Sequence, residues 1–160
     1  MSERLAPTTT PDTKFFWDAL KEGKLLIQRC SGCATLRHPP RPMCPRCNSL
    51  TWDTIESAGR GEVYSFVLPR HPPWPWFEGT YIVALIALEE GTRIVSNLCD
   101  VDPDDVTIGM PVQAFIEHFD NGVSLPQFRP RRNRLQPVGL AAAKRPNGER
   151  TRRKDAGRRP

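Results

Sequence analysis

The stretch Cys30-Ser-Gly-Cys33, separated by ten residues from Cys44-Pro-Arg-Cys47, decides the fold of this 160-residue chain. Four of the five cysteines lie in it. Two Cys-x-x-Cys turns bring four thiolates to one tetrahedral zinc ion, because two intervening residues let each turn fold back on itself. We expect Gly32 and Pro45 to help form these turns. Four protein ligands leave no position open for water, so the predicted zinc ion is structural.

Two disulfides, or two redox-active Cys-x-x-Cys pairs, are the alternative interpretations of this stretch. Residues 1–13 are polar and contain no apolar run, so we expect no signal peptide and a cytoplasmic location. In a reducing cytosol this cysteine pattern more often binds metal than forms disulfides. The sequence also contains nothing close to the ~18 consecutive apolar residues of a membrane-spanning helix.

The net charge of +5 is unevenly distributed along the chain. Residues 129–160 contain twelve Lys and Arg against two Asp and Glu, a balance of +10, whereas residues 1–128 carry a balance of −5. The basic character therefore belongs to the C-terminal end, which argues against a nucleic-acid-binding domain. Residues 131–160 are poor in apolar side chains, and we expect them to form a disordered basic tail.

Residues 1–11 are expected to be a disordered leader, and residues 12–58 to hold a helix and the zinc ribbon. Thr10-Pro11-Asp12 is typical of a helix start, and Gly23 of a helix end. The helix carries three consecutive aromatic residues, Phe15, Phe16 and Trp17. Two interpretations stay open for them: they cap the ribbon, or they dock the helix on a partner protein.

Gly59-Arg-Gly61 marks a change of pattern, after which turn signals alternate with short apolar runs. Glu90-Gly91 and Asn121-Gly122 are typical of tight hairpin turns. We therefore predict a mainly β chain in which residues 59–130 form a closed barrel of the oligonucleotide/oligosaccharide-binding (OB) type. Its five short antiparallel strands are expected at residues 62–68, 81–89, 93–99, 112–119 and 123–128.

The ordered set of motifs resembles the DUF35 family. The set comprises the aromatic helix, the two cysteine pairs around Pro39-Pro40, the segment Gly61-Glu-Val-Tyr-Ser-Phe66, and Phe128-Arg-Pro130. The resemblance covers residues 12–130 and implies a rubredoxin-like zinc ribbon followed by an OB-type barrel. The long basic tail is a departure from the family pattern.

The resemblance also implies a function. Family members are accessory subunits of thiolase-like enzymes, including lipid-transfer-protein-type aldolases of steroid side-chain degradation, and also occur with MaoC-like hydratases. We therefore expect a non-catalytic subunit of a hetero-oligomer that completes a thiolase or aldolase acting on acyl-CoA in lipid metabolism. The expected cofactor is a structural zinc ion, and a CoA ester is expected as a ligand shared with the partner.

The proline-rich loop after residue 69 carries Arg70, Trp74, Trp76 and Phe77. One interpretation is that this loop folds back and plugs the barrel end. The other is that it inserts beside the partner's active site and lines a tunnel for an acyl chain, because tryptophan and arginine are favoured interface anchors. Arg70 is a candidate contact for a CoA phosphate or for a partner carboxylate.

The sequence contains no recognised catalytic motif of its own. Cys99, the one cysteine outside the ribbon, is more typical of a small buried apolar residue than of a nucleophile. A single-stranded nucleic-acid-binding module, with the basic tail contacting phosphates, is the alternative function. Against it, the predicted barrel lacks a basic strand face with stacking aromatic residues.

Overall fold

The computed structural model describes residues 4–70, 77 and 80–131. Trp74 and Trp76 of the predicted contact loop, and the predicted tail from residue 132 onward, lie outside the described residues. The elements in chain order are α1 (Lys14–Lys21), β1 (Leu26–Cys30), β2 (Leu36–Arg37), β3 (Trp52–Glu56), β4 (Arg60–Val67), β5 (Ile82–Leu88), β6 (Arg93–Leu98), the 3₁₀ helix η1 (Pro103–Asp105), β7 (Pro111–His118) and β8 (Ser124–Pro130).

The ribbon is a small antiparallel sheet in the order β2-β1-β3. β1 lies in the middle, and its residues Ile27 and Gln28 are fully buried. Arg29 on β1 faces Asp53 on β3, and two nitrogens of its guanidinium donate to the two carboxylate oxygens at 2.8 and 2.6 Å. The sheet therefore leads the chain into the first cysteine turn at the end of β1 and out of the second one toward β3.

The five remaining strands form a closed barrel in the order β4-β5-β6-β8-β7, with β7 pairing back onto β4. The two predicted hairpins are confirmed between β5 and β6 and between β7 and β8. One pair differs from the all-antiparallel expectation, because β6 and β8 run parallel through Leu98 and Phe128. The reason is topological: strand direction cannot alternate all the way around a ring with an odd number of strands.

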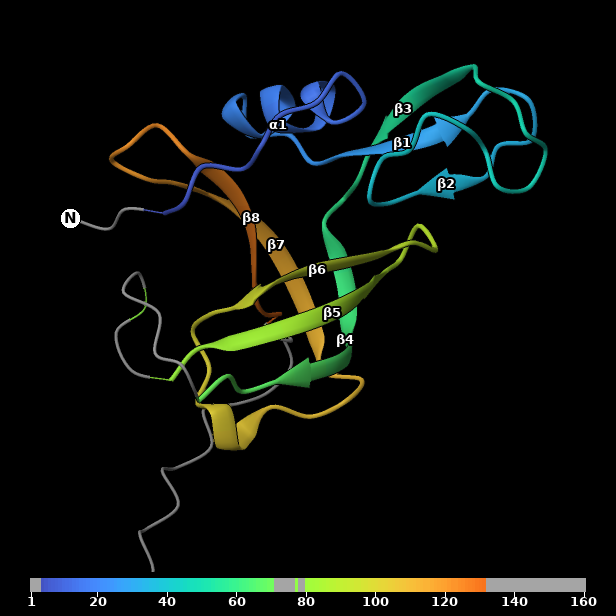
Figure 1. Ribbon diagram of the computed structural model, residues 1–160. Coiled ribbons are helices and arrows are strands. Elements are labelled where there is room, and N and C mark those ends of the chain that lie inside the picture. Colours follow the sequence, from blue (N-terminus) through green and yellow to red (C-terminus); the bar gives the residue numbers. More distant parts are fainter. Residues whose placement is uncertain (1–3, 71–76, 78–79, 132–160) are drawn as a thin grey trace, which may run out of the picture.

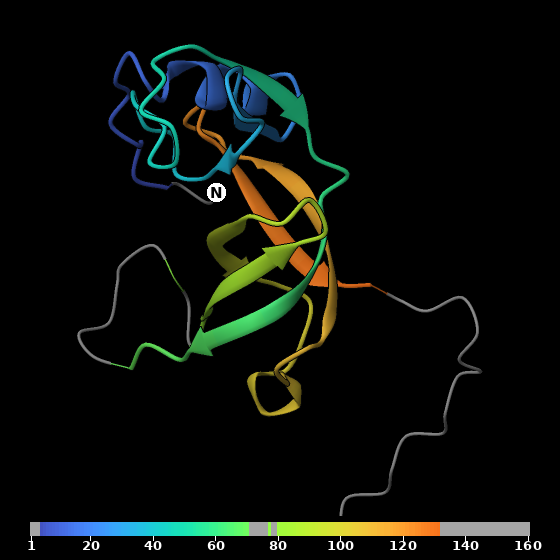
Figure 2. The ribbon, with the colours of Figure 1, turned by 90° about the vertical axis from the view of Figure 1, so that its right-hand side faces the viewer.

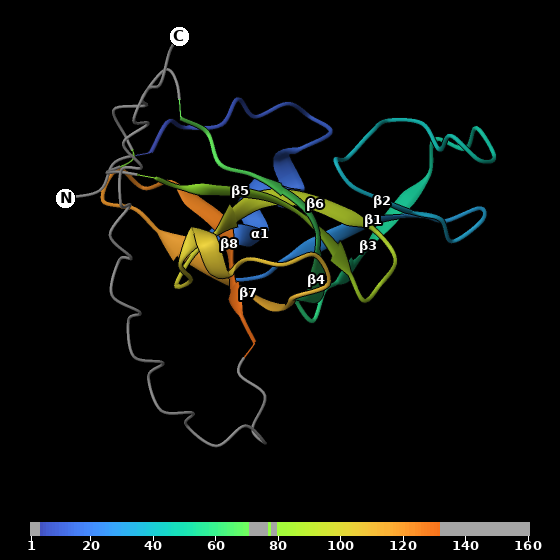
Figure 3. The same cartoon turned by 90° about the horizontal axis from the view of Figure 1, so that it is seen from below.

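Helix α1 joins the ribbon to the barrel. Figure 1 shows α1 above the barrel beside the ribbon sheet, and Figure 2 shows both at one end of the barrel with η1 at the other. Phe16 and Leu20 of α1 belong to the same buried core as Ile27 of the ribbon and Val63 and Phe128 of the barrel. The view from below places the ribbon to one side of the barrel (Figure 3).

The helix ends as predicted but begins later. Gly23 has a φ of +77°, and its amide donates to the Leu20 carbonyl while the Lys24 amide donates to Ala19, the pattern of a Schellman cap. At the other end, the Thr10 carbonyl accepts from the Thr13 and Lys14 amides, so residues 11–13 form a turn before the helix. The expected capping hydroxyl of Thr10 therefore precedes a turn and not the helix itself.

Arg4, expected as part of a disordered leader, contacts the loop residue Phe77 and the β7–β8 hairpin. The Arg4 guanidinium lies 4.0 Å from the ring centre of Phe77 and 5.2 Å from that of Phe119. The Arg4 carbonyl accepts a hydrogen bond from Asn121 Nδ2 at 2.7 Å. Local composition does not reveal these contacts, because each partner is far away along the chain.

Within the described residues, no helix has the length and apolar character needed to cross a bilayer.

Candidate metal centre and neighbouring pockets

The two cysteine pairs converge on one point at the tip of the ribbon. The four sulfur atoms of Cys30, Cys33, Cys44 and Cys47 all lie within 4.8 Å of one another. Cys30 Sγ is 3.5 Å from Cys47 Sγ, and Cys33 Sγ is 3.6 Å from Cys44 Sγ. These spacings exceed the ~2.05 Å of a disulfide and suit four thiolates around a zinc ion at ~2.3 Å. All five cysteines are free, so the disulfide interpretation is wrong.

The two cysteine turns are near copies of each other. In the first, the Ala34 amide donates to the Cys30 carbonyl at 2.9 Å; in the second, the Asn48 amide donates to Cys44 at the same distance. The residue after each pair has left-handed backbone geometry, with φ of 58° at Ala34 and 57° at Asn48. The expected role of Gly32 is therefore not observed, because the left-handed position of the first turn falls on Ala34.

The surroundings of Cys33 favour a thiolate, whereas hydrogen bonds shared with the sulfur atoms of Cys33 and Cys30 raise the pKa of Cys47 to about 12. Cys33 Sγ lies 3.1 Å from the Thr35 hydroxyl, and this hydrogen bond holds the pKa of the Cys33 thiol to about 6. Cys30 and Cys44 are buried, Cys33 is half-buried and Cys47 is exposed, so four cysteine ligands, and not burial, would leave a zinc ion no open position. The geometry and the donor set thus fit a structural zinc ion, which would fix the tip of the ribbon and supply no reactive position.

The three predicted aromatic contacts of α1 have three different environments. Phe15 is half-buried and packs on Trp52 of β3, with ring centres 4.8 Å apart. Phe16 is only 3% exposed, so in this conformation it is a core residue. Trp17 is half-buried and lines an apolar pocket of about 230 Å³ with His38 and Pro126. The helix thus caps the ribbon through Phe15 and still presents Trp17 at the surface.

The two described residues of the predicted contact loop behave differently. Arg70 is exposed and forms no ion pair within the described part of the chain. Phe77 stacks on Tyr81 with ring centres 3.8 Å apart and an interplanar angle of 11°. Phe77 also lines a pocket of about 230 Å³ with Arg4 and Cys99, whereas the helix aromatic residues Phe16 and Trp17 line another.

The barrel contains two candidate nucleophiles, the Cys99 thiol and the Ser124 hydroxyl, and the structure favours neither. Burial, with nearby Glu117 and Asp100, raises the pKa of Cys99 to about 11, which keeps this thiol protonated near neutral pH. His118 Nδ1 lies 2.9 Å from Ser124 Oγ, a pair that sequence reasoning missed. Ser124 is 8% exposed, and no described carboxylate holds the second ring nitrogen of His118, so the arrangement lacks the parts of a catalytic triad.

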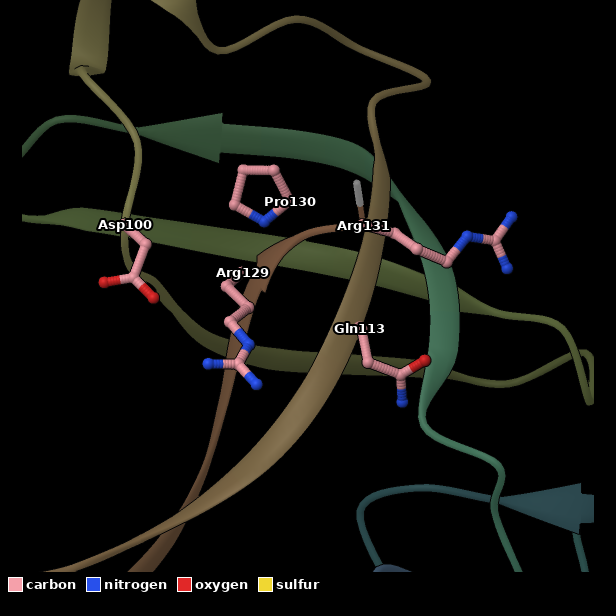
Figure 4. A pocket seen from close by; sticks show the side chains of 5 residues that line it. All are labelled: Asp100, Gln113, Arg129, Pro130 and Arg131. Carbon is pink, nitrogen blue, oxygen red and sulfur yellow. The ribbon is translucent and has the colours of Figure 1, made fainter. Parts of the chain in front are cut away.

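A cavity of about 530 Å³, lined mostly by polar residues, opens beside the start of β7 and the end of β8. Figure 4 shows its lining: Asp100 lies on one side, Arg131 points away on the other, and Arg129, Pro130 and Gln113 lie between them. Arg131 is already paired with Glu89 at 3.3 Å, and Arg129 lies 5.1 Å from the ring centre of Phe115. Arg131 is thus neutralised by an ion pair, whereas Arg129 has a ring contact and no ion pair within the described residues.

The fold and the cysteine site define a zinc ribbon joined to an OB-type barrel, and family comparisons agree. Residues 17–53 match the protein family described as the rubredoxin-like zinc ribbon domain of ChsH2. Residues 54–117 match the family described as the C-terminal OB-fold domain of ChsH2. A DUF35 domain-containing scaffold protein of Methanocaldococcus jannaschii is 38% identical over 114 residues, which cover 67% of this chain and 81% of the relative. The chain belongs to the DUF35 family.

Two other relatives are much longer than the matched region. A probable enoyl-CoA hydratase alpha subunit of Thermomonospora curvata is 50% identical over 127 residues, covering 79% of this chain and 40% of the relative. A 3-oxo-4,17-pregnadiene-20-carboxyl-CoA hydratase alpha subunit of Mycobacterium tuberculosis is 42% identical over 110 residues, covering 69% and 35%. The chain therefore spans well under half the length of these two relatives.

A solved structure described as an Ltp2-ChsH2(DUF35) aldolase contains a chain of matching fold. The two share 51% sequence identity with a TM-score of 0.75, and the match covers 78% of this chain and 98% of that one. Unlike the hydratase subunits, that chain is thus matched over nearly its whole length.

Proposed function

We propose that this chain is a non-catalytic accessory subunit that binds and completes a lipid-transfer-protein-type aldolase, a thiolase-like enzyme acting on acyl-CoA thioesters in steroid or fatty-acid side-chain metabolism. The observation that carries the proposal is the match to the ChsH2 chain of an Ltp2-ChsH2(DUF35) aldolase, at 51% identity over 98% of that chain. The Mycobacterium tuberculosis hydratase subunit, whose name includes the CoA ester 3-oxo-4,17-pregnadiene-20-carboxyl-CoA, supports the same area of metabolism.

The described residues are consistent with a subunit that supplies no reactive group. The four ribbon cysteines form a closed metal site, the Cys99 thiol has a raised pKa, and Ser124 is buried. The reactive groups are then supplied by the partner enzyme, and this chain supports the partner's site.

The contact surface of the proposal has two parts. The first is the loop that carries Arg70, Trp74, Trp76 and Phe77, which we propose to lie beside the acyl-CoA channel of the partner. The second is the exposed side of α1, where Phe15 and Trp17 are half-buried. The CoA ester is proposed as a ligand shared between the two proteins, with Arg70 as a contact for its phosphates or for a partner carboxylate.

Reconstitution tests the proposal. The purified chain is mixed with the Ltp2 polypeptide of the solved relative, and complex formation and aldol cleavage of a side-chain CoA ester are measured. We expect a stable complex, cleavage that depends on both chains, and no turnover by this chain alone. Turnover of an acyl thioester by this chain without a companion would refute the accessory role.

Substitution in the loop tests the contact surface separately. The double variant Trp74→Ala/Trp76→Ala should weaken the complex or its activity, because aromatic anchors carry much of an interface's binding energy. Ile108→Ala is the matched control, since Ile108 is an apolar side chain with 64% exposure outside both proposed contact regions. Equal activity and affinity for both variants would show that the loop is not part of the contact.

A further inference from the structure

Buried polar atoms without a hydrogen-bond partner gather at the seam between the ribbon and the barrel. Two of the side chains lie on the ribbon side, Gln28 of β1 and its register partner Arg37 of β2. Two lie on the barrel side, Glu90 and Thr92 of the β5–β6 hairpin. The atoms are Gln28 Nε2, the three guanidinium nitrogens of Arg37, Glu90 Oε2 and Thr92 Oγ1, and none forms a hydrogen bond within the described part of the chain. Buried polar groups in folded proteins are nearly always paired, so this group of atoms needs a physical explanation.

The β5–β6 hairpin and the ribbon face each other across one cavity. In Figure 1 the tip of the hairpin extends toward the ribbon sheet. A cavity of about 250 Å³ lies between them, and its lining includes Arg37 from the ribbon and Gly91 and Thr92 from the hairpin. Glu90 directly precedes Gly91, and its Oε1 accepts a hydrogen bond from the Ala58 amide. Arg37 and Glu90 therefore lie on the two sides of the same seam.

The charges on the two sides are opposite, and neither is neutralised. The ion pairs of the described residues involve neither Arg37 nor Glu90. Arg37 is 6% exposed and its guanidinium nitrogens are buried, so an ion from solution does not reach them in this conformation. Among the described residues, Glu90 Oε2 is the only carboxylate oxygen that is buried and lacks a hydrogen bond. A buried charge without a partner is destabilising, and each of these two groups would satisfy the other.

We propose that the seam also adopts a closed conformation, in which Arg37 of the ribbon and Glu90 of the hairpin form a buried ion pair. In this conformation Oε1 of Glu90 keeps its hydrogen bond from the Ala58 amide, and Oε2 accepts from the Arg37 guanidinium. The cavity between the hairpin and β2 narrows as the two sides approach. The pair then acts as a latch, which sets the orientation of the zinc ribbon relative to the barrel. This inference concerns the chain alone and does not rest on the proposed partner.

A double-mutant cycle on the zinc-loaded chain tests the ion pair, with chemical denaturation as the measurement. The variants are Arg37→Met, Glu90→Gln and the double variant, and glutamine keeps an oxygen for the Ala58 amide while it removes the charge. Each single variant should unfold at a lower denaturant concentration, because the other charge is left buried and unpaired. The double variant should unfold at a concentration no lower than that of the less stable single variant. Losses that add in the double variant would overturn the proposal.

A control cycle and an NMR experiment separate the ion pair from a general effect on folding. Glu89 is the matched control, since it is the neighbouring carboxylate and already pairs with Arg60 and Arg131. The effects of Arg37→Met and Glu89→Gln should therefore add. In chains that keep Arg37, the ¹H–¹⁵N resonance of its Nε should shift in Glu90→Gln and stay unchanged in Glu89→Gln. An equal response of that resonance to both variants, or no response to either, would exclude the closed conformation.

Discussion

The Glu90 carboxylate in the β5–β6 hairpin accepts a hydrogen bond from the Ala58 amide at 2.8 Å, and so ties the barrel to the linker that leaves the ribbon. The same oxygen accepts from the Ser57 hydroxyl at 3.0 Å, and the Ser57 hydroxyl in turn accepts from the Gly59 amide at 2.9 Å. The linker of residues 57–59 joins β3 of the ribbon to β4 of the barrel. A charged acceptor shared by two of its donors fixes the direction in which the chain passes from β3 to β4.

Removal of this carboxylate should loosen the linker. We expect Glu90→Ala to lower the free energy of unfolding by about 1–3 kcal/mol, because the half-buried Ser57 hydroxyl and the Ala58 amide of an exposed residue both lose a charged acceptor. The matched control is Glu89→Ala, whose carboxylate makes exposed ion pairs with Arg60 and Arg131 and should change stability little. Chemical denaturation of both variants measures the difference, and equal losses would contradict the role of Glu90.

Ala34 occupies a left-handed backbone position that suits glycine better than alanine. Ala34→Gly should raise the free energy of unfolding of the zinc-loaded chain by about 0.5–1 kcal/mol, because the clash of its Cβ outweighs the extra freedom of unfolded glycine. Asn48→Gly at the equivalent place in the second turn should give a smaller change, since asparagine tolerates this conformation. A loss of stability in Ala34→Gly would show that another contact of the methyl group dominates.

Gly61 lies against the backbone of the neighbouring strand. A Cβ atom at this position would be 2.4 Å from the Ala87 carbonyl oxygen and 2.9 Å from a methyl group of Ile86. We therefore expect Gly61→Ala to destabilise the barrel by about 1–3 kcal/mol. At Gly32 the nearest atom to such a Cβ is 3.5 Å away, so Gly32→Ala should be tolerated. Thermal unfolding of the two variants, with zinc content measured, distinguishes these cases.

The zinc site should be required for the fold of the ribbon. Cys44→Ser is expected to lose zinc and the cooperative unfolding of residues 25–56, because metal affinity contributes directly to folding in a site of this kind. Cys99→Ser should keep a single bound zinc ion, since Cys99 lies outside the cysteine cluster. Metal analysis of both proteins after gel filtration gives the answer, and zinc retained by Cys44→Ser would contradict the four-ligand assignment.

His38 should make stability depend on pH on the acid side. Burial lowers the pKa of His38 from 6.5 to about 4, so the unfolded chain binds this proton more readily than the folded chain. Stability is then lost as the pH falls from about 6.5 toward 4, and a His38 ring that titrates near pH 4 in an NMR experiment would confirm the cause. Zinc content must be followed in parallel, since acid also competes for the thiolates.

Much of the fold follows from local sequence signals. The metal site depends on two short spacings, and the hairpins on Glu90-Gly91 and Asn121-Gly122, so both could be predicted without tertiary information. The parallel closure of β6 on β8 was missed, although it follows from the odd number of strands in a ring. The packing of Arg4 on Phe77 was also missed, because a short polar leader shows no periodicity.

A cavity of about 250 Å³ that Arg37 lines, between the ribbon and the β5–β6 hairpin, could not be predicted for a similar reason. Its walls combine residues 36–45 with residues 91–93, which only the tertiary fold brings together. Arg37 lies in a two-residue strand among prolines, where no alternation of apolar and polar residues indicates which side chain is buried. The burial of Gln28, its register partner on β1, was equally invisible in the sequence.

The barrel has a consequence for how companion proteins are recognised. Within the described residues each barrel strand has a neighbour on both sides, so the edges open to strand addition are those of β2 and β3 in the ribbon sheet. Recognition by the barrel must then use its outward-facing side chains and loops. Substitution of surface side chains on such a barrel can suit it to a different partner protein. The backbone hydrogen bonds of the barrel stay the same.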